Sequence, residues 1–262
     1  MAGNATKITA RGFGWTHAGR SEAALSDIDV VIEPGERVLL CGDSGSGKST
    51  LLAAMAGVLG SDEEGTRTGE LLLEDSSGLV EEPGHTIPVG LVLQDPDSQV
   101  ISARVGDDIA FGCENLAYPR EEIWRRVTAA KELVGPFVDL DFPTERLSGG
   151  QKQRLALAGV IAMGAGVVLL DEPTANLDPA GARDVVRAVS RLVEETGATL
   201  VVVEHQHAAW DGVLDRAVEL DRGRIVADTS FAEVAQRRQV SGLPQARRLS
   251  EACLLYTSPS PR

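Results

Sequence analysis

The chain of 262 residues is poor in cysteine and in aromatic residues, with three cysteines and 4% aromatics. The three cysteines lack the spacing of metal ligands and are too few for a disulfide framework, so we expect a reduced, cytosolic setting. No uncharged run reaches the ~18 residues that suggest a membrane-spanning helix. The longest, residues 155–170, contains three glycines and runs into two acids, which predicts a buried helix followed by a buried strand. The first 20 residues lack an apolar segment, and we expect no signal peptide.

Basic residues are too few to balance the acids: 25 Lys and Arg stand against 39 Asp and Glu, for a net charge of −14. Broad nucleic-acid binding needs a basic footprint. The charge balance therefore argues against that class of function and is typical of a soluble protein. The apolar content of 43% is that of an ordinary globular chain with ample core.

The distribution of apolar residues predicts strands that alternate with helices. Strands are expected at residues 7–15, 25–32, 38–41, 71–73 and 199–203. Helices are expected at residues 49–57 and 182–192, a loop at 76–88 and a hairpin at 218–226. Helical spacing of apolar residues among charges, at about 98–146, suggests a helical insertion. This alternation implies a largely parallel α/β core.

Residues 42–49 read Gly-Asp-Ser-Gly-Ser-Gly-Lys-Ser, the G-x-x-x-x-G-K-[ST] pattern of a phosphate-binding loop. They lie between a predicted buried strand and a predicted helix, which is the context that the pattern requires. The glycines let backbone N–H groups point at phosphate oxygens, and the helix adds its positive N-terminus. Lys48 would reach the β- and γ-phosphates of ATP, and Ser49 would offer its hydroxyl to Mg²⁺. The predicted nucleotide-binding residues here are Gly42, Asp43, Ser44, Gly45, Ser46, Gly47, Lys48, Ser49 and Thr50.

Two adjacent acids, Asp171 and Glu172, follow the apolar run 167–170. The carboxyl end of a buried strand is where α/β sheets place ligand chemistry. Two neighbouring carboxylates at such a strand end are costly without a cation. We therefore expect Asp171 to hold Mg²⁺, directly or through water, and the alternative is a solvated acidic turn.

Residues 147–151 read Leu-Ser-Gly-Gly-Gln and lie between these two motifs. The three motifs in this order resemble one large family, the ATP-binding-cassette (ABC) ATPases, over about residues 6–252. The resemblance implies an α/β fold: a P-loop NTPase (RecA-like) core with a mainly parallel sheet, an N-terminal antiparallel β subdomain and an inserted α-helical subdomain. It also implies an ABC ATPase domain at 6–240 with the helical subdomain at about 98–165, and the start of a truncated C-terminal helical region at 241–252.

The resemblance assigns roles to single residues. Glu172 is implied to be the base that polarises the attacking water, Gln94 to sense Mg²⁺ and that water, and His205 to contact the γ-phosphate. Gln94 and His205 each follow a predicted strand end, as in the family. Trp15 stands where the family has an aromatic that stacks on adenine, and its ring face suits stacking. The alternative for Trp15 is a tryptophan packed in the core.

The Leu-Ser-Gly-Gly-Gln motif opens a predicted helix, so its hydroxyl and N–H groups can clamp a phosphate at a helix N-terminus. In the family this clamp closes on the nucleotide of the partner subunit, and residues 175–178 resemble the loop that crosses the dimer seam. A second ABC ATPase subunit, identical or different, is therefore implied. The residues of the second clamp are Ser148, Gly149, Gly150 and Gln151.

Residues 92–99, 107–112 and 114–116 resemble the ATPase of energy-coupling-factor importers, which take up vitamins or transition-metal ions. This resemblance implies transmembrane partner subunits and a place on the cytoplasmic side of the cell membrane. A groove formed by Val100, Ile101, Val105 and Phe111 would dock the membrane subunit, unless these residues pack the core of the insertion. The rival functions are a soluble ABC-type ATPase acting on nucleic acid or ribosomes, another importer or exporter class, and a non-hydrolysing regulatory cassette.

The last ten residues, 253–262, resemble a translated sequencing adapter, and we expect them to lie outside the natural protein. The natural C-terminus would then be missing from this sequence. The alternative is a disordered tail rich in serine and proline.

Overall fold

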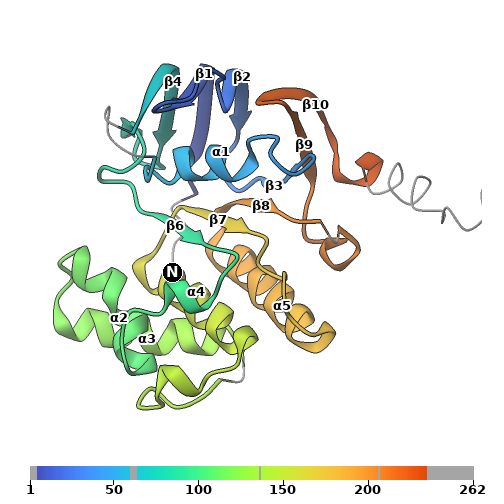
Figure 1. The fold of residues 1–262 in the computed structure, drawn as a ribbon. Coiled ribbons are helices and arrows are strands. Elements are labelled where there is room, and N and C mark those ends of the chain that lie inside the picture. The colour runs from blue at the N-terminus through green and yellow to red at the C-terminus, as the bar shows by residue number, and fades with distance from the viewer. Residues whose placement is uncertain (1–4, 60–63, 136, 206, 235–262) are drawn as a thin grey trace, which may run out of the picture.

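Figure 1 shows the computed structural model of the chain, which describes residues 5–59, 64–135, 137–205 and 207–234. The predicted regions at 241–252 and 253–262 lie outside the described residues. Two sheets and a set of helices are stacked in layers. The fold is the predicted α/β class, with an antiparallel N-terminal sheet and a mainly parallel sheet covered by helices.

The N-terminal sheet is antiparallel throughout its described strands. Its order is β2-β1-β4-β5, with β1 Lys7–His17, β2 Leu25–Ile32, β4 Gly65–Glu74 and β5 Val80–Glu81. The sequence predicted β1, β2 and β4, but the strand predicted at 71–73 covers only part of β4. The prediction was wrong about part of the 76–88 segment, because β5 pairs with residues 73 and 74 of β4 inside the predicted loop.

The second sheet carries the parallel core. Its order is β10-β9-β3-β8-β7-β6, with β3 Arg37–Cys41, β6 Val89–Val92, β7 Val167–Asp171, β8 Thr199–Val203, β9 Arg216–Asp221 and β10 Arg224–Ser230. Neighbouring strands from β9 to β6 run parallel, and β9 and β10 form an antiparallel hairpin. The predicted hairpin at 218–226 is thus confirmed, and the parallel strands have their carboxyl ends at one edge.

Helices cover both faces of this sheet. The helices are α1 Lys48–Met55, α2 Val105–Asn115, α3 Arg120–Leu133, α4 Gly149–Met163 and α5 Pro179–Thr196, with short 3₁₀ turns η1 Asp97–Gln99, η2 Thr144–Arg146 and η3 His207–Trp210. Alternate strand residues face opposite sides: Val38 and Leu169 pack toward α1 and the antiparallel sheet, whereas Leu39 and Val168 pack toward α2–α5. Helices α2, α3 and α4 follow one another inside the segment expected to be a helical subdomain, whose boundaries remain a prediction.

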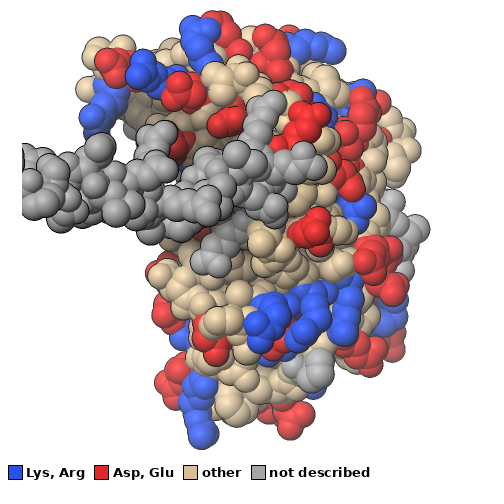
Figure 2. Space-filling view, turned by 90° about the vertical axis from the view of Figure 1, so that its right-hand side faces the viewer, with Lys and Arg blue, Asp and Glu red and all other residues tan. Residues whose placement is uncertain are grey.

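Acidic side chains are spread widely over the face in Figure 2, and basic side chains form one group below its centre, with others scattered around the edge. This distribution fits the net charge of −14 and gives that face no broad basic surface. Among the described residues, every helix is too short or too polar to cross a bilayer.

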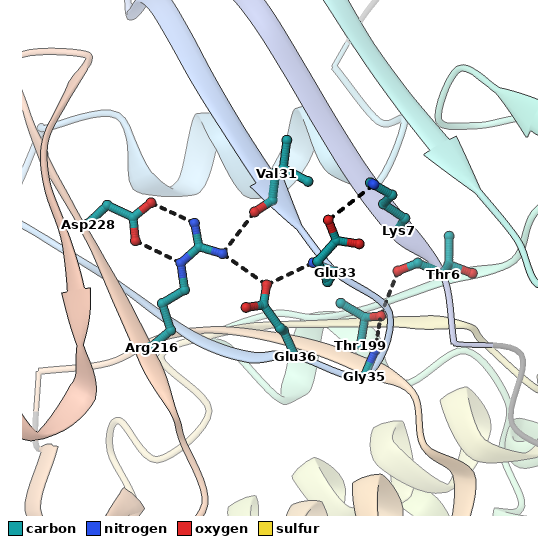
Figure 3. A network of polar contacts seen from close by, with 9 residues as sticks. All are labelled: Thr6, Lys7, Val31, Glu33, Gly35, Glu36, Thr199, Arg216 and Asp228. Atoms are coloured by element: carbon teal, nitrogen blue, oxygen red, sulfur yellow. Dashed lines mark hydrogen bonds and ion pairs between the residues drawn. The ribbon is translucent and has the colours of Figure 1, made fainter.

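Arg216 ties the two sheets together at the start of β9 (Figure 3). Its guanidinium forms a bidentate ion pair with Asp228 of β10 and also donates to Glu36 and to the carbonyl oxygen of Val31 in β2. A planar guanidinium with several fixed donors suits such a junction. These contacts join the hairpin to the antiparallel sheet at the amino ends of β3 and β9, at the sheet edge opposite the phosphate-binding loop.

Candidate active site

The predicted catalytic groups meet at the carboxyl edge of the parallel sheet. The phosphate-binding loop follows β3, Gln94 follows β6, Asp171 ends β7 with Glu172 directly after it, and His205 follows β8. These four strands are neighbours in the order β3-β8-β7-β6. The register places Asp171 beside Val203 on β8, so residues that are far apart in sequence share one edge. The strand assignments explain this convergence, because parallel strands end on the same side.

The phosphate-binding loop needs glycine at its two ends. Gly42 and Gly47 have φ of 139° and 105°, and a Cβ would lie 2.1 Å from the Leu220 carbonyl oxygen at Gly42 and 2.8 Å from the Ala24 carbonyl oxygen at Gly47. A side chain at either position would therefore force the loop away from the sheet. The Lys48 ammonium donates back to the carbonyl oxygens of Gly42 and Asp43, at 2.9 and 2.8 Å, which holds the loop curled.

A cleft of about 210 Å³ opens at the start of α1. It is lined by the loop, by the start of α1 and by three residues from other segments, namely Ala24, Ser44, Gly45, Gly47, Lys48, Ser49, Thr50, Glu172 and His205. The helix N-terminus and the Lys48 ammonium favour an anion here. The cleft therefore combines a phosphate cradle with a carboxylate and an imidazole in its lining.

Asp171 and Ser49 are two of the three predicted metal-binding residues, and Gln94 is the third. Burial raises the pKa of the Asp171 carboxyl, the Ser49 hydroxyl lowers it through a hydrogen bond, and the charge of Glu172 raises it further. Mg²⁺ is commonly held by one or two carboxylates together with substrate phosphates. The donor set of one carboxylate and one hydroxyl next to a phosphate cradle fits such an ion. Among the described residues there is also no separate group of three or more His, Cys, Asp or Glu that would form an all-protein metal site.

Glu172 is the centre of the polar contacts in the cleft. One carboxylate oxygen, Oε1, lies 3.1 Å from His205 Nε2, and the other, Oε2, accepts a hydrogen bond of 3.1 Å from Gln94 Nε2. Its backbone has φ of 48°, a conformation that costs a non-glycine residue on the order of 1–3 kcal/mol and that clusters at functional sites. Its N–H donates to Val203 of β8 at 2.9 Å, which fixes the turn. The three residues predicted to be catalytic are thus brought into direct contact, although their roles stay predictions.

No role was predicted for Glu204 from the sequence, and the structure places it next to this site. Its side chain is 4% exposed, accepts a hydrogen bond from the Thr174 hydroxyl and accepts another from the His205 N–H at 2.8 Å. A buried carboxylate is retained where it is well hydrogen-bonded. The only signal in the sequence is an acid at the end of the apolar run 200–203. Glu204 therefore positions the backbone of His205 and the turn after Glu172.

Trp15 differs from the expectation of an adenine-stacking ring. Its side chain is 5% exposed and belongs to the core between the sheets, and a Cβ at Gly65 would lie 2.3 Å from its ring. The indole N–H donates to His17 Nδ1 at 3.1 Å. The alternative of a packed core tryptophan describes this arrangement, and stacking on adenine would require the ring to move.

The second predicted clamp caps α4. The Ser148 hydroxyl accepts the Gln151 N–H, and the Gln151 side chain accepts the Ser148 N–H, which forms a capping box. Ser148 and Gly149 are exposed and do not line the cleft at α1. The helix starts two residues before the predicted Gln151. Within one chain, therefore, the clamp is exposed and lies outside the cleft of the chain's own phosphate loop.

Comparison with known proteins bears on these features. The family model for the ABC transporter matches residues 25–175, which hold the phosphate loop, the Leu-Ser-Gly-Gly-Gln motif and the acidic pair. The energy-coupling factor transporter ATP-binding protein EcfA1 of Caldanaerobacter subterraneus is 39% identical over 222 residues, 84% of this chain and 78% of that protein. The chain belongs to the ABC transporter family. Membership implies ATP as the nucleotide and ATP hydrolysis as the reaction of this domain.

Other relatives in the ABC family are longer, and solved structures share the fold. A protein of Methanosarcina mazei, named provisionally as an ABC transporter ATP-binding protein, is 37% identical over 90% of this chain, which spans only 41% of that protein. The structure of cbiO1 from Clostridium perfringens, part of the ABC transporter complex cbiONQ, has a TM-score of 0.71 at 29% identity and covers 95% of this chain and 98% of its own. An ATP-binding cassette dimer bound to ADP and Pi, at 22% identity and a TM-score of 0.68, shares the fold over 86% of this chain and 98% of its own.

Asp171→Asn is expected to raise the melting temperature of the nucleotide-free protein at pH 7. The folded-state pKa of Asp171 lies above its unfolded value, so the folded state binds more protons and its stability falls as pH rises through that window. The uncharged amide removes this penalty. Thermal melts at pH 7 and at pH 4 test the expectation, because the advantage should shrink at pH 4, where the wild-type carboxyl is increasingly protonated. Asp211→Asn, at an exposed turn, is the control, and a lower melting temperature for Asp171→Asn at pH 7 would contradict the assignment.

Proposed function

We propose that this chain is the ATP-hydrolysing subunit that powers a membrane importer of the energy-coupling-factor type, for vitamins or transition-metal ions. The observation that carries the proposal is the relation to EcfA1, which extends over 78% of that protein. The likeness to cbiO1, a part of the cbiONQ complex, supports it. The importer, its cargo and its membrane subunits are proposals, since the other relatives are longer than this chain.

In the proposed reaction a water attacks the γ-phosphorus of ATP, the bond to the β–γ bridging oxygen breaks, and ADP and phosphate leave. Glu172 holds the water and takes its proton as general base. Gln94 and His205, each in contact with a different oxygen of Glu172, orient that carboxylate. Lys48 and the loop N–H groups hold the phosphates. Asp171 and Ser49 would hold Mg²⁺, which when bound neutralises phosphate charge.

A second ABC ATPase subunit completes the site in this proposal. Ser148 and Gly149 are exposed at the start of α4, and a Cβ at Gly149 would lie 3.4 Å from Leu177, in the loop that the family uses at its dimer seam. An exposed phosphate clamp that does not serve its own chain's nucleotide suits a neighbouring subunit. One chain would then supply half of each of two sites.

The helical layer offers the surface for a transmembrane subunit. Ile101 is 61% exposed, and Phe111 on α2 and Trp124 on α3 are also exposed. The expectation that Val105 lines the docking groove is wrong, because Val105 is fully buried, and Val100 packs partly against the core. Asp108 accepts the N–H groups of Ile101 and Ser102, both at 2.8 Å, which fixes this turn beneath the exposed isoleucine. The proposed location is accordingly the cytoplasmic face of the membrane, held by protein partners.

Ile101→Asp is expected to release the chain from membranes without stopping its ATP hydrolysis. The variant places a charge in the proposed interface, where charged residues are depleted. The chain would be co-expressed with the transmembrane subunit of an energy-coupling-factor importer, and membrane and soluble fractions would be assayed for the chain and for phosphate release. Val226→Asp, at a side chain 57% exposed on β10, is the matched control and should stay bound. Unchanged membrane binding of Ile101→Asp, or equal release of both variants, would contradict this docking surface.

The rival function on nucleic acid or ribosomes has no support in these observations. The relatives are named as transporter proteins, and the charge of −14 opposes a polyanionic partner. A regulatory cassette without hydrolysis is disfavoured because Glu172, Gln94 and His205 are all present and in contact.

A further inference from the structure

Gln153, in the second turn of α4, is a polar side chain enclosed in the core of the helical layer. It is 1% exposed. Its Nε2 donates to the carbonyl oxygen of Leu93 at 3.0 Å, and its Oε1 accepts from Gln99 Nε2 at 3.3 Å. A buried amide without partners would cost roughly 1–3 kcal/mol, so these contacts decide where the side chain sits. Gln153 therefore fastens the segment that follows β6 directly to α4.

Gln99 closes that segment, residues 93–99, into a compact loop. Its Oε1 accepts the Leu93 N–H at 2.9 Å, and its Nε2 also lies 3.1 Å from the Leu93 carbonyl oxygen and 3.3 Å from that of Asp95. The side-chain amide of Gln99, the last residue of the segment, thus binds both the N–H and the carbonyl oxygen of Leu93, the first residue. We name residues 93–99 the glutamine loop. Leu93 and Gln99, the two ends of the glutamine loop, are bonded to each other, and both are bonded to Gln153. The loop is therefore held against α4 as a single unit.

The tip of the glutamine loop also meets the first turn of α4. Lys152 forms an ion pair with Asp97, and a Cβ at Gly149 would lie 3.9 Å from Pro96. The Asp97 carboxylate is largely exposed, and such pairs contribute little to stability. The hydrogen bonds of the buried Gln153 amide therefore contribute most to holding the glutamine loop on α4, and the ion pair of Lys152 with Asp97 orients the middle of the loop.

The two ends of this joined unit carry different parts of the site. Gln94, in the glutamine loop, contacts Glu172 at 3.1 Å, whereas Ser148 caps the same helix α4 that Gln153 belongs to. We propose that Gln153 is a positioning residue that makes the glutamine loop and the start of α4 move together. A movement of Gln94 relative to the chain's own ATP site is then accompanied by a movement of Ser148 relative to the second subunit. This inference rests on the proposed function of an ATPase with shared sites.

Gln153→Met tests the inference, because methionine has a similar volume but cannot donate to Leu93 or accept from Gln99. We expect kcat to fall about tenfold through misplacement of Gln94 and Ser148, with the affinity of the monomer for ATP unchanged. Hydrogen exchange should become faster in residues 93–99 and 148–152 together and stay unchanged in β7 and β8. Gln99→Met, at a partly exposed site, should reproduce the pattern more weakly if Gln153→Met fails to fold.

Leu157→Met is the matched control, since Leu157 is a fully buried residue of the same helix, and this swap conserves volume. It should lower stability without the paired change in exchange. The inference is overturned if Gln153→Met keeps the wild-type kcat, if only one of the two segments exchanges faster, or if Leu157→Met behaves alike. Failure of the wild-type chain to hydrolyse ATP would instead overturn the proposed function, and the exchange result would still stand or fall by itself.

Discussion

Glu172→Gln is expected to bind Mg²⁺ and ATP and to hydrolyse ATP at least ~100-fold more slowly than the wild-type chain, the lower range for loss of a general base. One oxygen of the Glu172 carboxylate contacts His205 and the other contacts Gln94, so these two contacts hold the carboxylate in place. The amide has the same size and keeps a hydrogen-bonding side chain in that position. It cannot, however, take a proton from water.

Phosphate release under single-turnover conditions measures the chemical step, and size-exclusion chromatography with ATP measures dimer formation. The variant should accumulate as an ATP-bound dimer, because closure no longer leads to cleavage. Glu70→Gln, in an exposed ion pair with Arg11 on the antiparallel sheet, is the control and should turn over normally. Near-normal phosphate release by Glu172→Gln would remove Glu172 from the role of base.

The strength of the sequence prediction lay in the parallel core. Buried parallel strands are apolar on both faces and read as continuous runs, so residues 38–41 and 199–203 were located within one residue of β3 and β8. Gln94, Glu172 and His205 each follow such a run, so the sequence alone predicts that they lie at the same edge of the parallel sheet. Motif spacing supplied the phosphate loop in the same way.

The sequence prediction failed where long-range packing decides the structure. Strand β5 has only two residues, and Val80 is 52% exposed, so pairing with the edge of β4 creates it without a local pattern. Trp15 is buried because Gly65 on the neighbouring strand leaves room for its ring. Val105 is buried because its helix packs inward at that point, which helical spacing alone could not assign. The buried pair of Glu204 and Thr174 joins residues 30 positions apart and had no signal beyond one acid after an apolar run.

The start of α4 gives the second large expected effect. Ser148→Arg is expected to lower ATP hydrolysis on the order of 100-fold or more, comparable to removing a donor that stabilises the transition state. The residue is exposed and lies outside the cleft at α1, so the affinity of a single chain for ATP should stay unchanged. In a double variant with Glu172→Gln, the ATP-bound dimer of two identical chains should no longer form, because a guanidinium would occupy both clamps of that dimer. Ser148→Ala is the control, because it removes the helix cap, at a cost of about 1 kcal/mol, without placing a large side chain at the dimer seam.

Complementation between two inactive variants decides whether the clamp acts on the other subunit. Lys48→Ala loses the phosphate loop, and Ser148→Arg loses the clamp. In a mixed dimer of the two, the phosphate loop of the Ser148→Arg chain faces the clamp of the Lys48→Ala chain, so one whole site is restored. Phosphate release should therefore return when the two purified variants are mixed, whereas each alone stays inactive. If the clamp served its own chain, neither chain in the mixture would hold a complete site, and the absence of any regained hydrolysis would refute the shared site.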